Sequence, residues 1–243
     1  MLRIFKADLH IHTCLSPCTE LDMTPKRIIT KAKKEKIDII GICDHNSSEN
    51  SLAVIKASKN ININVLPGME VTSQEEVHVL ALFDELENTL KLQEYIYKNL
   101  PGENDEEAFG MQVIVNEKDE VLGFNSKLLI GATTASLEEI IQIIHKFGGI
   151  AIASHIDRES FSIISQLGFI PGNIELDALE ISSNITLKEA KKRFEIKYPL
   201  TCSSDAHYPH EIGKSFTSLL LKEGTVGEIK KALKNEDGRK LIH

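Results

Sequence analysis

The first residues that could bind a metal lie near the N-terminus, in the segment D-L-H-I-H. Asp8, His10 and His12 occupy alternate positions there. Because side chains alternate between the two faces of a strand, all three are expected on one face if this segment is a strand. Two imidazoles on one face form a chelate for a divalent metal such as zinc. For this motif alone, an ordinary pair of surface or core histidines is an equally good interpretation.

The same residue types recur after the next apolar runs. Asp44 and His45 follow IDIIGIC, and Glu70 follows VLPGM. The two oxygens of a carboxylate can each take a cation, so Glu70 could bridge two metal ions. His78 is a polar residue within the apolar run VHVLALF. Taken singly, Asp44 is better explained as a helix cap, His45 as a loop residue and His78 as a hydrogen-bonded core histidine.

Three further candidates follow later apolar runs. His155 ends GGIAIAS, and Asp205 and His207 follow LTCSS two positions apart. Each of these residues alone is weak evidence for a site. Random placement, however, would scatter such residues over helices and loops. Their recurrence at successive expected strand ends therefore predicts one shared metal site.

The rest of the sequence predicts a scaffold that brings strand ends together. Short apolar runs alternate with helical segments, which is typical of strand–helix units that form a parallel sheet. About seven units favour a closed barrel, in which the C-terminal strand ends carry the active site. The expected strands are 3–12, 37–43, 61–72, 77–83, 148–154, 177–183 and 198–204, and the expected helices are 23–36, 47–59, 86–100, 136–147, 159–168, 186–195 and 226–235.

One segment, about 101–134, interrupts this alternation. Its sequence GMQVIVNEKDEVLGFNSKLLIG predicts a hairpin with Glu-Lys-Asp-Glu at the tip. We interpret it as an insertion into a single domain that spans residues 1–243. We also expect the insertion to cover or border the site.

Composition limits the classes of protein. The 243 residues are 42% hydrophobic and 26% charged, which is typical of a globular protein whose core needs no metal or disulfide. A net charge of −8, 5% aromatic residues and no tryptophan make nucleic acid an unfavoured partner without excluding it. With four cysteines, no expected export signal and no apolar run long enough for a membrane span, we expect a cytoplasmic protein and no membrane partner. The sequence leaves the oligomeric state open.

Taken in order, D-L-H-I-H, D-H, G-M-E, a strand histidine, S-H and S-D-A-H resemble the PHP family (polymerase and histidinol phosphatase). The resemblance implies an α/β fold, a distorted (β/α)7 TIM-like barrel. It also implies two or three divalent metal ions: zinc, manganese or iron, with magnesium as a further candidate. The implied activity is that of a phosphoric ester hydrolase, in which a metal-activated hydroxide attacks phosphorus.

The resemblance assigns the candidate ligands to three metal sites: His10, His12, Glu70 and Asp205 in one; Glu70, His78 and His155 in the second; and His45 with His207 in the third. Cys18 lies where the family places another ligand of the third site. A thiolate there would favour zinc or iron; the alternative is an ordinary loop cysteine. Asp8 and Asp44 match no ligand position, and we expect them to orient histidines through hydrogen bonds.

Three residues are candidates for proton transfer or its support. His45 or His207 could protonate the leaving oxygen if it is not committed to a metal. Asp44, beside His45, is counted with them as a catalytic candidate.

Three other residues are candidates for substrate binding. Arg158 suits bidentate recognition of a phosphate, and Lys214 would supply a point charge. Solvated surface cations are an equally good interpretation of both. Glu180, which ends DALEISS, could touch substrate or satisfy the barrel rim.

Three functions are compatible with these residues. The compact size and acidic balance favour a phosphatase that acts on a small phosphomonoester or nucleotide. A nuclease-like phosphodiesterase would need a basic or aromatic path for a strand of nucleic acid. A non-catalytic metal-binding module is least favoured, because such a module would be expected to have lost ligands.

Overall fold

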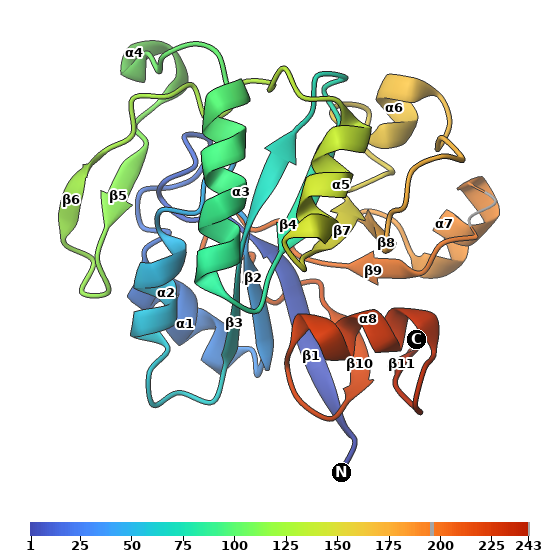
Figure 1. Ribbon diagram of the computed structural model, residues 1–243. Coiled ribbons are helices and arrows are strands. Elements are labelled where there is room, and N and C mark those ends of the chain that lie inside the picture. Colours follow the sequence, from blue (N-terminus) through green and yellow to red (C-terminus); the bar gives the residue numbers. More distant parts are fainter. Residues whose placement is uncertain (195–196, 243) are drawn as a thin grey trace.

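The computed structural model describes residues 1–194 and 197–242, and its main element is a curled sheet of nine strands (Figure 1). The strand order in the sheet is β11-β10-β1-β2-β3-β4-β7-β8-β9. The bounds of the strands are β1 Arg3–Ile11, β2 Ile39–Ile42, β3 Asn64–Thr72, β4 His78–Leu82, β7 Ile150–Ala153, β8 Ala178–Ile181, β9 Leu200–Cys202, β10 Thr217–Leu221 and β11 Lys240–Ile242.

The strands are not all parallel. β1, β2 and β3 pair in parallel, as do β7, β8 and β9. β4 is antiparallel to both β3 and β7, which differs from the expected parallel sheet. Only residues 73–77 separate β3 from β4, and a parallel connection needs a crossover of a dozen or more residues.

Beyond β9 the chain returns to β1 at the edge of the sheet that carries the histidines. Ile11, at the end of β1, forms an isolated parallel bridge with Ala206, just beyond β9. There the amide of His12 donates to the carbonyl of Ala206 at 3.1 Å. The fold is therefore α/β with a partly closed sheet. The count of seven strand–helix units is not confirmed, because β4 is antiparallel and β10 and β11 extend the sheet beyond β1.

Helices cover the sheet and also close its hollow side. Their bounds are α1 Pro25–Lys34, α2 Ser51–Ala57, α3 Leu86–Asn99, α4 Glu106–Phe109, α5 Leu137–Lys146, α6 Ile163–Leu167, α7 Leu187–Phe194 and α8 Val226–Lys234. The helix expected over 186–195 corresponds to α7, and its last expected residue lies outside the described residues. α8 joins the apolar cluster of Leu9, Leu80 and Ile152, which it packs against through Ile229.

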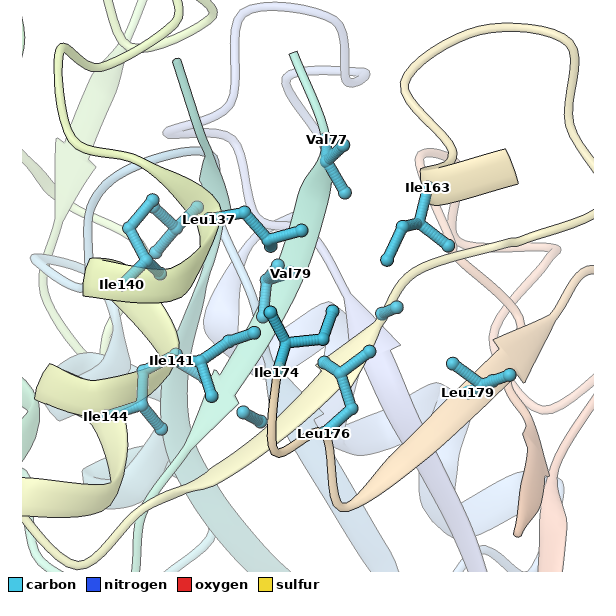
Figure 2. Close-up of a cluster of buried hydrophobic side chains, with 14 of the residues drawn as sticks. Val77, Val79, Leu137, Ile140, Ile141, Ile144, Ile163, Ile174, Leu176 and Leu179 are labelled. Atoms are coloured by element: carbon cyan, nitrogen blue, oxygen red, sulfur yellow. The ribbon is translucent and has the colours of Figure 1, made fainter. Parts of the chain in front are cut away.

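The largest apolar cluster lies between the sheet and α5 (Figure 2). α5 begins with a capping box in which Ser136 and Glu139 satisfy each other's backbone amides. The side chains of Ile140 and Ile144 are fully buried in this cluster with Val79 of β4. This packing holds β4 and β7 in place, and the start of β4 and the end of β7 lead into the site.

The expected insertion forms the two-stranded hairpin β5 (Val113–Val115) and β6 (Val121–Phe124). Its turn contains the predicted Glu-Lys-Asp-Glu tip. Lys26 of α1 holds that tip: its amide donates to Asp119 and its ammonium to the carbonyl of Lys118. None of the helices in the described part of the chain is both long and apolar enough to span a membrane.

Candidate metal centre

The strands deliver three of the predicted ligands directly to one edge of the sheet. His10 lies near the end of β1 and Glu70 near the end of β3. His78 is the first residue of β4, and it pairs with Thr72 at the end of β3. Because β4 runs antiparallel, its beginning lies at the same edge as the ends of the parallel strands. This reversed strand explains how a histidine at the start of an apolar run reaches the site.

The other predicted ligands lie in the loops just beyond β1, β2, β7 and β9: His12, His45, His155, Asp205 and His207. Two of them have left-handed backbone conformations, with φ of 26° at His155 and 50° at Asp205. Such angles are uncommon outside glycine and cluster at functional sites. The loops therefore turn sharply where they present these side chains.

Glu70 is the centre of the site. Its Oε1 lies 3.0 Å from Nδ1 of His78 and 3.2 Å from Nε2 of His155. Its Oε2 lies 3.2 Å from Nδ1 of His45 and 3.6 Å from Nε2 of His12. Glu70 is 1% exposed, and its two oxygens face different groups of imidazoles. This is the arrangement expected of a carboxylate that bridges two cations.

A second carboxylate, Asp205, faces the other side of the histidine cluster. Its Oδ1 lies 3.2 Å from Nε2 of His10, 3.2 Å from Nε2 of His12 and 3.6 Å from Nδ1 of His207. Three groups of side chains converge closely enough to hold an ion each: His12, His45 and His207; His10, His12 and Asp205; and His45, Glu70 and His78.

Burial and mutual contact set the charges in this cluster. Burial alone would raise the pKa of Glu70, but the neighbouring His78 and His10 hold it well below its usual range. Burial lowers the pKa of His12 to about 4, and the nearby His207 adds to this effect. Burial would also lower the pKa of His10, but Asp205 and Glu70 outweigh it and raise that pKa well above its usual value. Without metal, the surrounding carboxylates thus favour a proton on His10, and burial favours a neutral His12.

The donor set fits divalent metal ions. Several buried polar atoms of the cluster have no hydrogen-bond partner, among them Glu70 Oε1, Asp205 Oδ1, His45 Nδ1 and His78 Nδ1. Buried polar groups are nearly always satisfied, so this many unpaired donor and acceptor atoms facing one another fit a site that binds cations. Imidazole and carboxylate ligands together suit zinc, iron or manganese.

Behind the cluster, Glu180 of β8 orients His10. Its Oε1 lies 2.9 Å from Nδ1 of His10, and both side chains are buried. A carboxylate on Nδ1 fixes the tautomer that leaves Nε2 free for a metal. Glu180 is not among the residues that line the pocket, a position that agrees with the alternative of a role within the barrel rim; its contact with substrate stays a prediction.

Comparison with known proteins agrees with this geometry. A family model described as the PHP domain matches residues 8–165, well over half of the chain. The chain belongs to the PHP family. The matched range includes the candidate ligands from His10 to His155, whereas Asp205 and His207 follow its end.

Individual known proteins are similar over different parts of the chain. An uncharacterized protein of Methanocaldococcus jannaschii is 32% identical over an alignment of 102 residues that covers 38% of this chain and 60% of that protein. The structure of a lesion-specific endonuclease from Pyrococcus furiosus, PfuEndoQ, has a TM-score of 0.69 and 19% identity over 98% of this chain. This chain spans 58% of the endonuclease, so it corresponds to part of it. A candidate metal-dependent phosphoesterase from Bifidobacterium adolescentis has a TM-score of 0.55 and 20% identity, covering 95% of this chain and 96% of that one.

In this PHP chain Asp44 supports His12 and not the adjacent His45. Its carboxylate accepts hydrogen bonds from the amide and hydroxyl of Thr13 and from the hydroxyl of Ser16 at 2.7 Å. Ser16 Oγ in turn lies 3.0 Å from Nδ1 of His12. Asp44 thus orients a histidine, as predicted, but through Ser16. The sequence contains no motif that would have singled out Ser16.

Asp8 does not share the face of His10 and His12 as predicted. The pairing of β1 with β2 shifts register between Asp8 and Ile11, and such a bulge breaks the alternation of side chains. The Asp8 carboxylate accepts hydrogen bonds from the amides of Ser204 and Gly213, each at 2.9 Å. It therefore anchors the loop that carries Asp205 and orients no histidine.

A pocket of about 280 Å³ opens over the cluster. Arg158 lines it, and its Nη2 lies 2.5 Å from Oδ2 of Asp205. Cys18 also lines the pocket, but its side chain is outside the three convergent ligand groups. Lys214 is exposed and is not among the pocket residues, so its predicted role as a phosphate clamp is not supported by its position.

The pocket also contains two apolar residues that the sequence did not single out, Ile130 and Phe161. Ile130 belongs to the insertion, which therefore borders the site as expected. Phe161 precedes α6 and has a φ of 56°, a conformation that costs a bulky residue on the order of 1–3 kcal/mol.

Proposed function

We propose that this chain is a metal-dependent phosphoesterase that hydrolyses a small phosphomonoester or nucleotide. The observation that carries this function is the buried Glu70, whose two oxygens face separate groups of imidazoles beneath an open pocket. Membership of the PHP family supports a hydrolase that acts on phosphoric esters.

The proposed ligands are those that the sequence predicted: His10, His12, His45, Glu70, His78, His155, Asp205 and His207, with Cys18 as a further candidate for a third site. Two or three zinc, manganese or iron ions, or magnesium, would when bound activate water and neutralise charge on the phosphoryl group. We place Glu70 and Asp205 among the ligands because both carboxylates are buried and the surrounding imidazoles balance their negative charge.

The other residues of the pocket would bind the phosphoryl group and move the proton. Arg158 is 40% exposed, so its guanidinium can leave the carboxylate of Asp205 and bind a phosphoryl oxygen instead. His207 is 22% exposed and its Nδ1 lies 2.9 Å from the carbonyl of Asp205, which leaves Nε2 free. We assign it protonation of the leaving oxygen when no metal occupies it, with His45 as the alternative.

Metal-stripped protein, reloaded separately with manganese, zinc, iron or magnesium, tests the function. The panel contains phosphomonoesters, mononucleotides, nucleoside bisphosphates and an oligonucleotide. We expect metal-dependent release of phosphate from one class, lost in His10→Ala and retained in His145→Ala, whose histidine lies in α5 outside the cluster. Stoichiometric metal binding without turnover of any ester would contradict the proposed function.

A nuclease-like phosphodiesterase is the second candidate. The similarity to the Pyrococcus furiosus endonuclease over 98% of this chain favours it. A further structure of Endonuclease Q holds a 27-mer duplex with an abasic lesion at the active site. Incision of such a duplex by the metal-loaded chain, without release of phosphate from monoesters, would favour this candidate over the first.

Three broader interpretations accompany the proposed function. We propose that residues 1–243 form a single PHP domain whose sheet corresponds to a distorted (β/α)7 TIM-like barrel. We also propose a cytoplasmic location, on the basis of the composition and cysteine content. A non-catalytic metal-binding role remains the least favoured, because the histidine and carboxylate candidates lie in one cluster around Glu70 and Asp205.

A further inference from the structure

Two apolar side chains stand out among the residues that line the pocket. The other lining residues are metal-ligand candidates or carry a polar group, and only Ile130 and Phe161 are hydrocarbon side chains in this part of the described structure. They come from different loops: Ile130 from the insertion and Phe161 from the connection between β7 and α6.

Both loops are tied to the backbone of the metal cluster. Asn46, which follows His45, is fully buried and has a φ of 50°. Its Nδ2 donates to the carbonyls of Leu129 and Gly131, each at 2.8 Å, and so fixes the residue between them, Ile130.

Phe161 is fixed in a similar way. The amide of His78 donates to the carbonyl of Phe161 at 2.9 Å. The hydroxyl of Ser162 donates to the carbonyl of Arg158 at 2.8 Å, which closes the loop that carries both Arg158 and Phe161. These contacts hold Phe161 in its left-handed conformation.

The ring of Phe161 is placed for a second stacking partner. It stacks on the imidazole of His78, with centroids 4.6 Å apart and an interplanar angle of 18°. Yet 37% of Phe161 remains exposed, and it contributes to the pocket. This left-handed backbone keeps an aromatic ring exposed in the pocket beside Arg158 and the cluster, a position that suits contact with a substrate.

We propose, on the basis of the phosphoesterase function proposed above, that Phe161 determines specificity by stacking on an aromatic ring of the substrate. The phosphoryl group would lie between the metal cluster and Arg158, and the ring would lie against Phe161 and Ile130. A pocket of about 280 Å³ is at the small end for ligand sites, which suits a phosphoryl group and one ring system. The preferred substrate is therefore an aryl-bearing phosphoester or a nucleotide, and not a sugar phosphate.

The test compares esters that differ only in aromaticity. Benzyl phosphate and cyclohexylmethyl phosphate have leaving groups of the same carbon number and similar acidity. Metal-loaded wild type should hydrolyse the benzyl ester with a kcat/KM about tenfold higher, the upper range of an aromatic pair. Phe161→Leu should reduce this ratio to about threefold or less, and Phe161→Tyr should retain it. The matched control is Phe169→Leu, an exposed phenylalanine beyond α6 that should leave the ratio unchanged.

A second pair, 5′-AMP and ribose 5-phosphate, distinguishes a nucleobase from a ring attached directly to the ester. A preference that depends on Phe161 in either pair supports the assignment. Equal kcat/KM values within both pairs, or a preference that Phe161→Leu retains, would overturn it. If Phe161 only supported His78, the variant would lose metal and would lose activity equally on both members of a pair.

Direct binding separates failure of this assignment from failure of the proposed function. Calorimetry measures the Kd of metal-loaded wild type and Phe161→Leu for benzylphosphonate and cyclohexylmethylphosphonate. If no ester is hydrolysed, the phosphoesterase function fails, and a Phe161-dependent preference for benzylphosphonate would still support the aromatic contact. Equal affinity for both phosphonates in wild type, together with equal kcat/KM values within both ester pairs, would overturn the aromatic contact while leaving the phosphoesterase function intact.

Discussion

Replacing Glu180 by glutamine should weaken metal binding without removing a ligand. Glu180 Oε1 lies 2.9 Å from Nδ1 of His10, and neither side chain is more than 1% exposed. Glutamine has nearly the same shape and can still accept this hydrogen bond through its oxygen. The substitution therefore removes the negative charge that makes the imidazole a stronger ligand, while the position of His10 is kept.

The expected loss follows from the type of interaction. Removing an outer partner of a metal-binding histidine typically costs about 10–100-fold in metal affinity, which corresponds to about 1.4–2.8 kcal/mol. Competition with a chromogenic chelator for zinc or manganese measures the affinity. The matched control is Glu175→Gln, an exposed glutamate that precedes β8.

Two results would refute this reasoning. Equal metal affinity in Glu180→Gln and Glu175→Gln would mean that the contact with His10 does not tune the cluster. A loss well above 100-fold would mean that Glu180 does more than support one ligand, and circular dichroism would then show whether the fold is retained.

Three further predictions concern protonation and packing. Metal binding at pH 7 should release about one proton from His10, because the surrounding carboxylates raise its pKa and binding displaces the proton; binding enthalpies that do not vary with the buffer's ionisation enthalpy would contradict this. Glu228→Gln should lower the thermal midpoint at neutral pH, because Arg239 holds the pKa of Glu228 below its usual range. That stabilisation is present above the unfolded pKa and is lost as the pH falls through the folded one, so the two midpoints should converge in acid. Gly41→Ala should cost about 1–3 kcal/mol in urea unfolding, because its Cβ would collide with a backbone carbonyl of β1, whereas Gly123→Ala has open space and should cost far less.

The sequence predicted the residues of the cluster because strand ends can be recognised locally. Each candidate ligand follows or begins an apolar run, and a sheet brings such ends to one edge. The antiparallel direction of β4 was missed, because VHVLALF has the same composition whichever way the strand runs. The short turn before it was the available signal, since it leaves no room for a crossover helix.

Contacts between side chains distant in the sequence could not be predicted. Glu180 was singled out, but its partner His10 is 170 residues away, and nothing local distinguishes a carboxylate behind a ligand from one that faces substrate. Phe161 was missed for a similar reason. Its role depends on a left-handed backbone angle and on stacking against His78, and the local sequence ESFSII predicts neither of them.

The bridge between Ile11 and Ala206 joins two segments that the ribosome synthesises at different times. His10 and His12 leave the ribosome almost 200 residues before Asp205 and His207. At roughly 5–20 residues per second, the synthesis of the intervening residues takes on the order of ten seconds or more, and during this time Asp205 and His207 are absent. Through that interval a nascent chain holds several imidazoles without Asp205, so metal captured then would bind an incomplete and weaker site. Correct loading is therefore expected once Asp205 and His207 have emerged and their loop closes over β1.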